Sequence, residues 1–399
     1  MDRFVKSRPL MLLLLLTFCI SVLCSCKHRG DSVVSADEYT TIAMAKPKNL
    51  PGFARIISNF EQEHPGIRVK TVDVSSKPDD RHNVYVSALS GKDSAVDLYW
   101  MDDTWLEEFA GYGYLLPLDG YITLEREKYV PQAIEKFTVQ QKLYCVPVAL
   151  DMSFLYYRKD LISEVPSTWE DICRMTKEMQ SGLPEINYGI DVCDEVGDEM
   201  VFRLIEFLNA KNDSMEQAVT FYKDLIDAYY AQRERKGEFS HAFKNGDSLF
   251  LYDDNSAFSE MKDDFSAVHG KVGITLLPGG NGKRTGALLG GYGFGINRNS
   301  RHVPQAVQFL EYLQSEDVLR SLSRDYSYMP ALTNLYQDEM VLDQNPHFRG
   351  LLALLPELKP RNHIPVFDGR TAEVKKVLKN LFLETITTEE AAAQLENLR

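Results

Sequence analysis

The sequence predicts an α/β protein with two lobes. Short apolar or alternating segments that are typical of strands take turns with helical patterns along the chain, and this alternation indicates an α/β fold. The chain has 399 residues. About 370 of them remain once an N-terminal export segment is set aside, and a chain of that length favours two hydrophobic cores over one.

The first 26 residues have the pattern of a bacterial export signal. Three basic residues precede an apolar run over residues 10–23, which is the order found in secretory signals. The run is shorter than the about 20 residues that a membrane span needs. Residues 23–26, Leu-Cys-Ser-Cys, resemble a lipobox in which Cys26 receives the lipid. An ordinary secretory signal with a chance cysteine is the alternative.

We therefore expect a signal peptide over residues 1–25 and a flexible tether over residues 26–35. The lipid on Cys26 is expected to hold the protein at the cell membrane on its extracytoplasmic side, either in a periplasm or at the cell surface. No second segment has the length and hydrophobicity of a membrane span.

The composition excludes several classes of protein. The formal net charge is −14, and loss of residues 1–25, with three basic side chains and one acidic, makes it −16. This acidity argues against a nucleic-acid partner, since that binding depends on clustered lysine and arginine. Apart from Cys26, the mature chain keeps Cys145, Cys173 and Cys193, whose spacing fits neither a disulfide framework nor a zinc site. A bridge between Cys173 and Cys193 and free buried thiols both remain open.

Strands and helices alternate over the first hundred residues. Residues 38–45 are rich in β-branched and apolar side chains and end at a turn, which predicts a strand. Residues 53–60 place isoleucine and phenylalanine on one helical face, and residues 67–72 alternate as a strand. A helical pattern follows over residues 84–89. The apolar run over residues 95–100 is of the kind buried in parallel sheets.

Seven stretches of the chain carry motifs that belong together. Two examples are Pro-Gly-Ile-Arg-Val at 65–69 and Pro-Ser-Thr-Trp-Glu-Asp at 166–171. The others are 97–109, 112–119, 143–161, 243–248 and 289–297. In order and spacing they resemble the extracellular solute-binding proteins of ABC importers, in the family 1 branch that includes maltose- and trehalose-binding receptors. The resemblance spans nearly the whole mature chain.

The resemblance implies a type II-like periplasmic-binding-protein fold, in which crossing hinge strands join two α/β lobes that close on a ligand. We place the crossings near residues 146–151 and 288–293. The expected lobe 1 is 36–148 with 286–328, and the expected lobe 2 is 149–285 with 329–399.

Asp102, Asp103 and Trp105 are the first candidates for ligand contact. They lie just past the end of a strand that reads as buried, and open α/β sheets bind ligands at this position. The alternative is structural, because an aspartate caps a helix well and Trp105 could be a core residue of that helix.

Asp151 and Asp254 are carboxylate candidates at strand ends. Asp151 directly follows an apolar run, where an acid has little structural reason to lie unless it faces the ligand. In the family that this chain resembles, an acidic residue near this position accepts ligand hydroxyls. Asp254 follows a strand over residues 249–252 and reaches the ligand from lobe 2 or belongs to a surface turn.

Gly290, Gly291 and Tyr292 form the second crossing. A missing side chain lets a ligand approach the backbone, and an aromatic ring can stack on a sugar. Several members of the family have tryptophan where Tyr292 stands, so the resemblance leaves the identity of the sugar open. The glycines could also serve only to turn the chain.

Catalytic motifs are missing or incomplete. The loop at residues 279–285 lacks the glycine spacing of a phosphate loop, and no histidine pair has zinc-hydrolase spacing. Asp103 and Asp151 could be posed as the carboxyl pair of a glycosidase, but their separation decides that mechanism. We therefore expect no enzyme activity, no metal and no cofactor.

The sequence thus predicts a monomeric, lipid-anchored receptor that captures a carbohydrate, an oligosaccharide, and delivers it to the permease of an ABC importer. Three alternatives stay open. They are a receptor for another polar solute such as a polyamine or a metal complex, a surface enzyme that acts on glycans, and a receptor-like scaffold that has lost transport.

Overall fold

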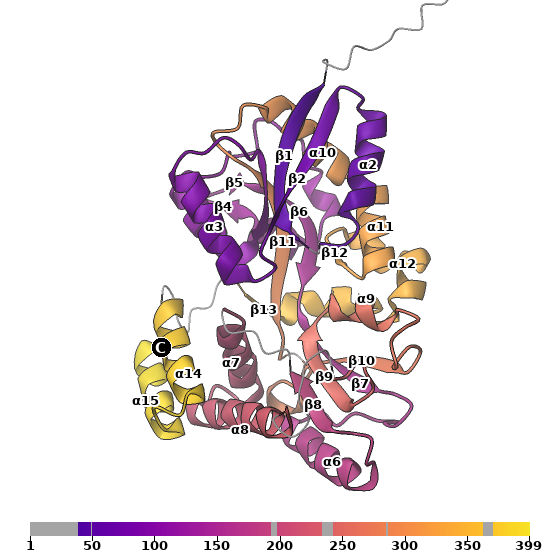
Figure 1. Cartoon of the computed structure of the whole chain (residues 1–399), viewed down its shortest axis with the longest axis vertical. Coiled ribbons are helices and arrows are strands. Elements are labelled where there is room, and N and C mark those ends of the chain that lie inside the picture. The colour runs from indigo at the N-terminus through magenta and orange to yellow at the C-terminus, as the bar shows by residue number, and fades with distance from the viewer. Residues whose placement is uncertain (1–38, 49, 193–197, 234–241, 285, 362–369) are drawn as a thin grey trace, which may run out of the picture. The chain divides into compact units, whose positions relative to one another are not determined.

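Two β-sheets carry the architecture of this chain in the computed structural model (Figure 1). The structure describes residues 39–399 apart from 49, 193–197, 234–241, 285 and 362–369. Cys26 and Cys193 therefore lie outside the described residues. Every helix and strand that follows belongs to one unit, Thr40–Arg399.

The larger sheet has the strand order β12-β6-β11-β3-β1-β2, and β13 pairs with β11 beside this path. The strands β1, β2 and β3 are parallel, whereas β11 runs antiparallel to β3 and β6. The strands are β1 (Thr40–Pro47), β2 (Ile67–Val74), β3 (Leu98–Asp102), β6 (Cys145–Asp151), β11 (Leu288–Ile296), β12 (Met329–Pro330) and β13 (Lys359–Pro360).

The smaller sheet has the order β10-β7-β9-β8. Its strands are β7 (Ser153–Arg158), β8 (Tyr188–Val192), β9 (Ser248–Asp254) and β10 (Val272–Leu276). A separate hairpin joins β4 (Thr138–Val139) and β5 (Lys142–Leu143). Alternating strands and helices thus produce the predicted α/β fold, and the strands predicted near 38–45, 67–72 and 95–100 are β1, β2 and β3.

Helices cover the larger sheet because their apolar stripes need burial. The predicted helix at 53–60 is α2, which buries Phe53, Ile56 and Phe60. The helices packed around this sheet are α2 (Phe53–Glu63), α3 (Pro78–Ser90), α4 (Leu106–Gly111), α5 (Pro131–Lys136), α10 (Val303–Leu313), α11 (Glu316–Tyr326), α12 (Glu339–Gln344) and α13 (Leu351–Leu354).

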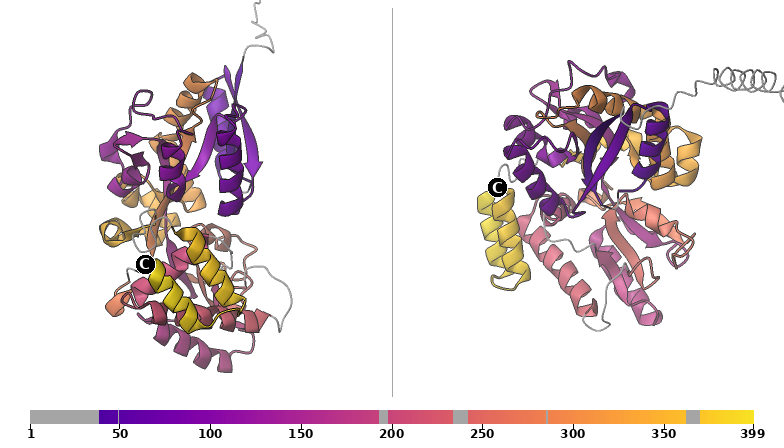
Figure 2. Two further views of the ribbon diagram at one scale, coloured as in Figure 1. Left: turned by 90° about the vertical axis from the view of Figure 1, so that its left-hand side faces the viewer. Right: turned by 45° about the horizontal axis from the view of Figure 1, so that its top comes forward.

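Helix α6, beside the smaller sheet, begins after Thr168. The hydroxyl of Thr168 accepts a hydrogen bond from the backbone N–H of Asp171 and caps the helix. The C-terminal helices α14 and α15 pack on α7 and α8 (Figure 2). These helices are α6 (Trp169–Gly182), α7 (Asp198–Ala210), α8 (Met215–Arg233), α9 (Ala257–Met261), α14 (Thr371–Phe382) and α15 (Thr388–Leu398). Short 3-10 turns lie at Asp103–Trp105, Arg126–Lys128, Gly280–Gly282, Thr333–Tyr336, Pro346–Phe348 and Leu355–Glu357.

The chain passes between the sheets at the predicted crossings. Strand β6 ends in the larger sheet at Asp151, and β7 begins in the smaller sheet at Ser153. The second predicted crossing coincides with β11. A third segment near this region, β13, was not predicted, and it pairs with the start of β11. The residue limits of the two lobes stay a prediction.

Three further features bear on the function. Within the described residues, no helix has both the length and the hydrophobicity to cross a membrane. The same residues contain no cluster of His, Cys, Asp and Glu suited to a metal ion. Cys145 and Cys173 are free thiols.

Candidate functional site

A cavity of about 420 Å³ lies where β6, β9 and β11 meet the start of α7. Its lining combines aromatic, acidic and basic side chains. The aromatic residues are Trp100, Tyr292, Tyr326 and Tyr328; the acids are Asp151, Glu199, Asp253, Asp254 and Glu260; the bases are Arg81, Arg203 and Arg361.

Two stacked rings form an aromatic wall of the cavity. The centroids of Trp100 and Tyr292 are 5.4 Å apart and their planes differ by 20°, because Trp100 on β3 and Tyr292 on β11 lie on paired strands. Tyr328 meets Trp100 edge to face at 6.5 Å. The Tyr292 hydroxyl donates a hydrogen bond of 3.2 Å to Asp151. Such a wall suits the C–H face of a sugar ring.

Arg361 occupies the floor of the cavity and binds three aspartates. Its backbone N–H donates to the carbonyl of Leu289 at 2.8 Å, which continues the pairing of β13 with β11. Its Nη1 donates to Asp151 at 2.8 Å. Its Nη2 lies 3.3 Å from Asp103 and 3.5 Å from Asp102. One guanidinium therefore links the ends of β3 and β6 with the 3-10 turn that follows β3.

Lys136 on α5 gives Asp103 a second cation. Its Nζ lies 3.0 Å from Asp103 Oδ2, and both side chains are buried. Burial alone raises the pKa of Asp103, but Lys136 and Arg361 outweigh it and hold this pKa below its ordinary value. The pKa of Asp102 is raised by burial, against the effect of Arg361. Asp103 is thus held as a carboxylate.

Asp102 and Trp105 have the structural roles that were the alternative to ligand contact. Asp102 accepts hydrogen bonds from the backbone N–H of Thr104 at 3.0 Å and from its hydroxyl at 2.7 Å, so it caps the 3-10 turn. Trp105 is buried, stacks on Phe109 and has Arg81 5.1 Å from its ring. Asp102, Asp103 and Trp105 are not among the described residues that line the cavity. Their contact with a ligand stays a prediction.

The two glycines of β11 make room for protein atoms. A Cβ added to Gly290 would lie 2.2 Å from Cζ of Arg361, and one added to Gly291 would lie 3.0 Å from the carbonyl oxygen of Ala149. The space that we assigned to a ligand at Gly290 is filled by Arg361. Tyr292, by contrast, does face the cavity.

Asp151 and Asp254 both line the cavity. Burial raises the pKa of Asp151 to about 7, although Arg361 opposes this shift. Asp254 accepts a hydrogen bond of 2.7 Å from the backbone of Ser256, so it serves the turn after β9 and faces the cavity as well.

Glu199 and Asp253 are two further acids that line the cavity. Burial raises the pKa of Glu199 to about 7, with Arg361 and Arg203 acting against it. Burial also raises the pKa of Asp253 well above its ordinary value, and the neighbouring charge of Asp254 adds to this effect.

Sequence reasoning missed Trp100, Glu199, Arg203 and Arg361. Trp100 lies in the run 95–100 that predicted a buried strand, and a tryptophan near a strand end could have been weighed as a stacking residue. Arg361 gave no local signal, because its partner Asp151 is 210 residues away.

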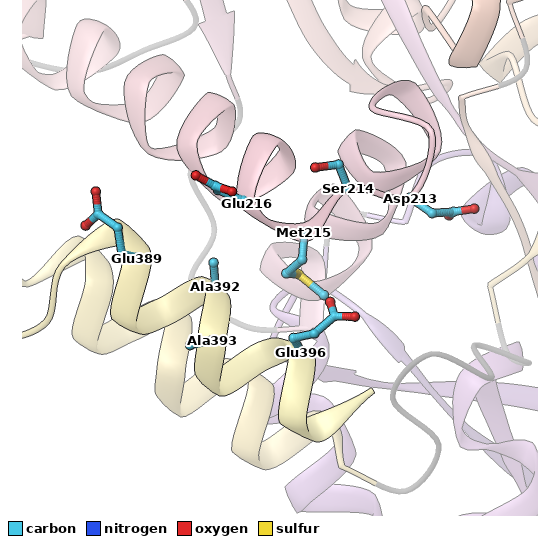
Figure 3. A pocket seen from close by; sticks show the side chains of 8 residues that line it. All are labelled: Asp213, Ser214, Met215, Glu216, Glu389, Ala392, Ala393 and Glu396. Carbon is cyan, nitrogen blue, oxygen red and sulfur yellow. The ribbon is translucent and has the colours of Figure 1, made fainter.

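A second hollow of about 570 Å³ lies between the start of α8 and α15 (Figure 3). Its described lining residues are Asp213, Ser214, Met215, Glu216, Glu389, Ala392, Ala393 and Glu396. No aromatic ring is among them, so these residues provide no stacking surface for a sugar.

Comparisons with known proteins bear on the family of this chain. A family model described as bacterial extracellular solute-binding protein matches residues 55–350. The protein named "Probable ABC transporter-binding protein" of Deinococcus radiodurans is 26% identical over 317 residues, which cover 72% of this chain and 74% of that protein.

Solved structures share the fold. The maltose-bound MalE3 of T. maritima has a TM-score of 0.80 at 24% identity, over 90% of this chain and 98% of that one. The maltose/maltodextrin-binding domain MalE of Bdellovibrio bacteriovorus, bound to maltotriose, has a TM-score of 0.74 at 18% identity, over 90% of this chain and 98% of that one. At these identities the likeness shows a common fold.

Proposed function

Because this chain belongs to the family of bacterial extracellular solute-binding proteins, we propose that it captures an oligosaccharide in the cavity between β6, β9 and β11 and delivers it to the permease of an ABC importer. The observation that carries the sugar assignment is the stacked pair Trp100 and Tyr292 beside the carboxyl groups that line the same cavity. Aromatic faces cover the C–H side of a sugar, and carboxyl groups accept its hydroxyl hydrogens.

The size of the cavity supports this proposal. Its volume of about 420 Å³ falls within the range of roughly 300–1,000 Å³ that is typical of small-molecule sites. Two proteins with the same fold were solved with maltose and with maltotriose bound. Capture is expected to favour the conformation in which both sheets contact the sugar, since a ligand shifts a conformational equilibrium by its differential affinity.

Binding without covalent chemistry is part of the proposal. Asp103 and Asp151 are the pair that a glycosidase mechanism would need, and both are held by Arg361. Asp103 is also bound to Lys136 and lies outside the cavity lining. A nucleophile or general acid needs access to the sugar, so this arrangement favours a receptor over an enzyme.

The proposal extends to the location of the protein. We propose that Cys26 carries a lipid that anchors a monomer at the extracytoplasmic face of the membrane, where the permease lies. Labelling of growing cells with a palmitate analogue tests this, because the wild-type chain should take up the label and Cys26→Ala should not. Equal labelling of both chains would contradict the anchor.

Ligand-dependent thermal unfolding tests the sugar assignment. The exported protein, purified in mild detergent, is heated with each of a panel of mono- and oligosaccharides, polyamines and amino acids. A ligand at 100 times its Kd should stabilise the fold by about 2.7 kcal/mol. Trp100→Leu should abolish the shift caused by a saccharide, whereas Phe265→Leu, at an aromatic residue that is 97% exposed, should retain it. Absence of a shift with every saccharide would contradict the proposal.

A further inference from the structure

The proposed function leaves the chemical class of the sugar open, and the charges around the cavity narrow it. Resting on that function, we propose that the ligand is an amino sugar oligosaccharide, whose protonated amino group is bound by the carboxyl groups at the end of β9 and the start of α7. A neutral or an acidic sugar would offer these carboxyl groups no opposite charge.

Carboxyl groups outnumber arginines in the cavity lining. The lining contains Asp151, Glu199, Asp253, Asp254 and Glu260 against Arg81, Arg203 and Arg361. An excess of acidic over basic side chains around a cavity favours a cationic ligand, because a bound cation stabilises the charged forms of the acids.

Two of the three arginines are engaged by the protein itself. Arg361 is bound by three aspartates, of which Asp102 and Asp103 lie outside the cavity lining. Arg81 donates hydrogen bonds to the backbone carbonyls of Ser75 and Ser76, at 3.2 and 2.9 Å. Neither guanidinium is therefore well placed to bind an anionic group of a ligand.

The acids at the end of β9 accept hydrogen bonds from neutral groups. The backbone N–H of Asp254 donates to Asp253 at 2.8 Å, and that of Ser256 donates to Asp254 at 2.7 Å. Within the described part of the chain, no ion pair is formed by Glu199, Asp253 or Asp254. Burial raises the pKa values of Glu199 and Asp253, because the nearby charge of Arg203 does not fully offset the desolvation of their carboxylates. Burying a carboxylate without a partner is costly, and an entering ammonium group would replace that cost with charge-assisted hydrogen bonds.

The aromatic wall fits the same ligand. Trp100 and Tyr292 line the same cavity as these acids, and their rings stack on each other. The face of an aromatic ring attracts a cation as well as the C–H side of a sugar. A sugar ring that bears both hydroxyl groups and an ammonium group would contact the aromatic side chains and the acids together.

A matched pair of trisaccharides tests the inference. The glucosamine trimer and its fully N-acetylated form share one backbone and differ in positive charge. Binding to the exported protein in mild detergent is measured by calorimetry at pH 6.5, with maltotriose and spermidine as further probes. We expect the glucosamine trimer to bind at least about tenfold tighter than its acetylated form, a difference of about 1.4 kcal/mol.

A variant of Asp253 tests whether the acids of the cavity cause the preference for the glucosamine trimer. Asp253→Asn keeps the shape of the side chain and should reduce the preference for the amine at least several-fold, while unfolding of the free variant checks that it is folded. Asp264→Asn, at a side chain that is 93% exposed, should leave the preference unchanged. Equal reduction in both variants would overturn the assignment to this cavity.

The outcomes separate this inference from the proposed function. Equal binding of both trimers, or binding of maltotriose alone, would overturn the amino sugar and leave the sugar receptor standing. Binding of spermidine without any sugar would overturn both the amino sugar and the sugar receptor and leave a polyamine receptor. Binding of none of the four probes would overturn the amino sugar.

Discussion

Two groups of carboxyl groups meet at the cavity, and they differ in their cations. Asp102, Asp103 and Asp151, at the ends of strands of the larger sheet, share the guanidinium of Arg361. Glu199 and Asp253, on the side of the smaller sheet, form no ion pair within the described residues and have raised pKa values. Acidic residues in and beside one cavity thus serve two purposes, and the presence or absence of an ion pair distinguishes them.

The difference has an energetic meaning. A buried ion pair contributes little net stability relative to apolar packing, but loss of one partner leaves an uncompensated charge. The Arg361 cluster is therefore a structural element that the protein completes by itself. Glu199 and Asp253 carry a cost in the free protein that a ligand can remove, which is how a binding site differs from a core.

Replacement of Arg361 should produce the largest effect. Arg361→Gln leaves three aspartates around a neutral side chain, and breaking a buried ion pair costs about 3–5 kcal/mol. We expect the free energy of unfolding, measured with urea at pH 7.5, to fall by about that amount. Arg361→Gln combined with Asp151→Asn should recover part of it, because one negative charge is removed.

An exposed ion pair supplies the control. Arg349 lies 3.4 Å from Glu339, and both side chains are more than half exposed. Arg349→Gln should change the free energy of unfolding by less than about 0.5 kcal/mol. If Arg361→Gln were as stable as this control, the Arg361 cluster would not be a structural element and the comparison of the two groups would fail.

Local patterns were sufficient to predict most of the fold. The helical face at 53–60 became α2 because Phe53, Ile56 and Phe60 pack inward, and the apolar run at 146–151 became β6. These elements depend on residues a few positions apart, which periodicity detects. The short strand β13 has no periodicity to detect, since it has two residues.

The site was predicted less completely, since it depends on long-range contacts. Tyr292, Asp151 and Asp254 do line the cavity, because strand ends and crossings are visible in the sequence. The cation that holds Asp151 was not visible, since Arg361 reaches it only when β13 joins β11. Gly290 was interpreted as space for a ligand, and only the folded chain shows that Arg361 fills that space.

Neutralisation of Glu199 should raise the free energy of unfolding, whereas loss of Arg361 should lower it. Its pKa is raised to about 7 in the folded state by burial, above its value of about 4.3 in an unfolded chain. The folded state therefore gains protons, and stability, as pH falls through 7. We expect stability to rise by about 2 kcal/mol between pH 8 and 5.5 from this group, and Glu199→Gln to remove that contribution.

Urea unfolding at several pH values measures this contribution. Glu199→Gln should be more stable than the wild type at pH 8, and this difference should shrink by about 2 kcal/mol at pH 5.5. Glu216→Gln, at an exposed glutamate on α8, should follow the wild type at every pH. A stability loss in Glu199→Gln at pH 8 would show that Glu199 has a partner in the free protein, and it would then belong with the Arg361 cluster.

His347 extends the comparison to a buried base. Its ring lies between Phe154 and Phe258, with centroids 5.5 and 4.9 Å away, and neither ring nitrogen has a hydrogen-bond partner among the described residues. Burial, with Lys262 nearby, lowers the pKa of His347 to about 3. Between about pH 6.5 and pH 3, only the unfolded chain then binds a proton at this histidine. The free energy of unfolding therefore decreases as the pH drops, whereas Glu199 makes it increase.

His347→Phe should therefore remove an acid-dependent loss of about 1 kcal/mol between pH 7 and 5.5. The melting temperature of the variant should fall less over this range than that of the wild type, whereas His269→Gln, at a half-exposed ring, should behave as the wild type. An unchanged pH dependence in His347→Phe would mean that the folded protein protonates His347 readily. Burial without a partner would then not suffice to shift a pKa in this protein, and the same doubt would apply to Glu199 and Asp253.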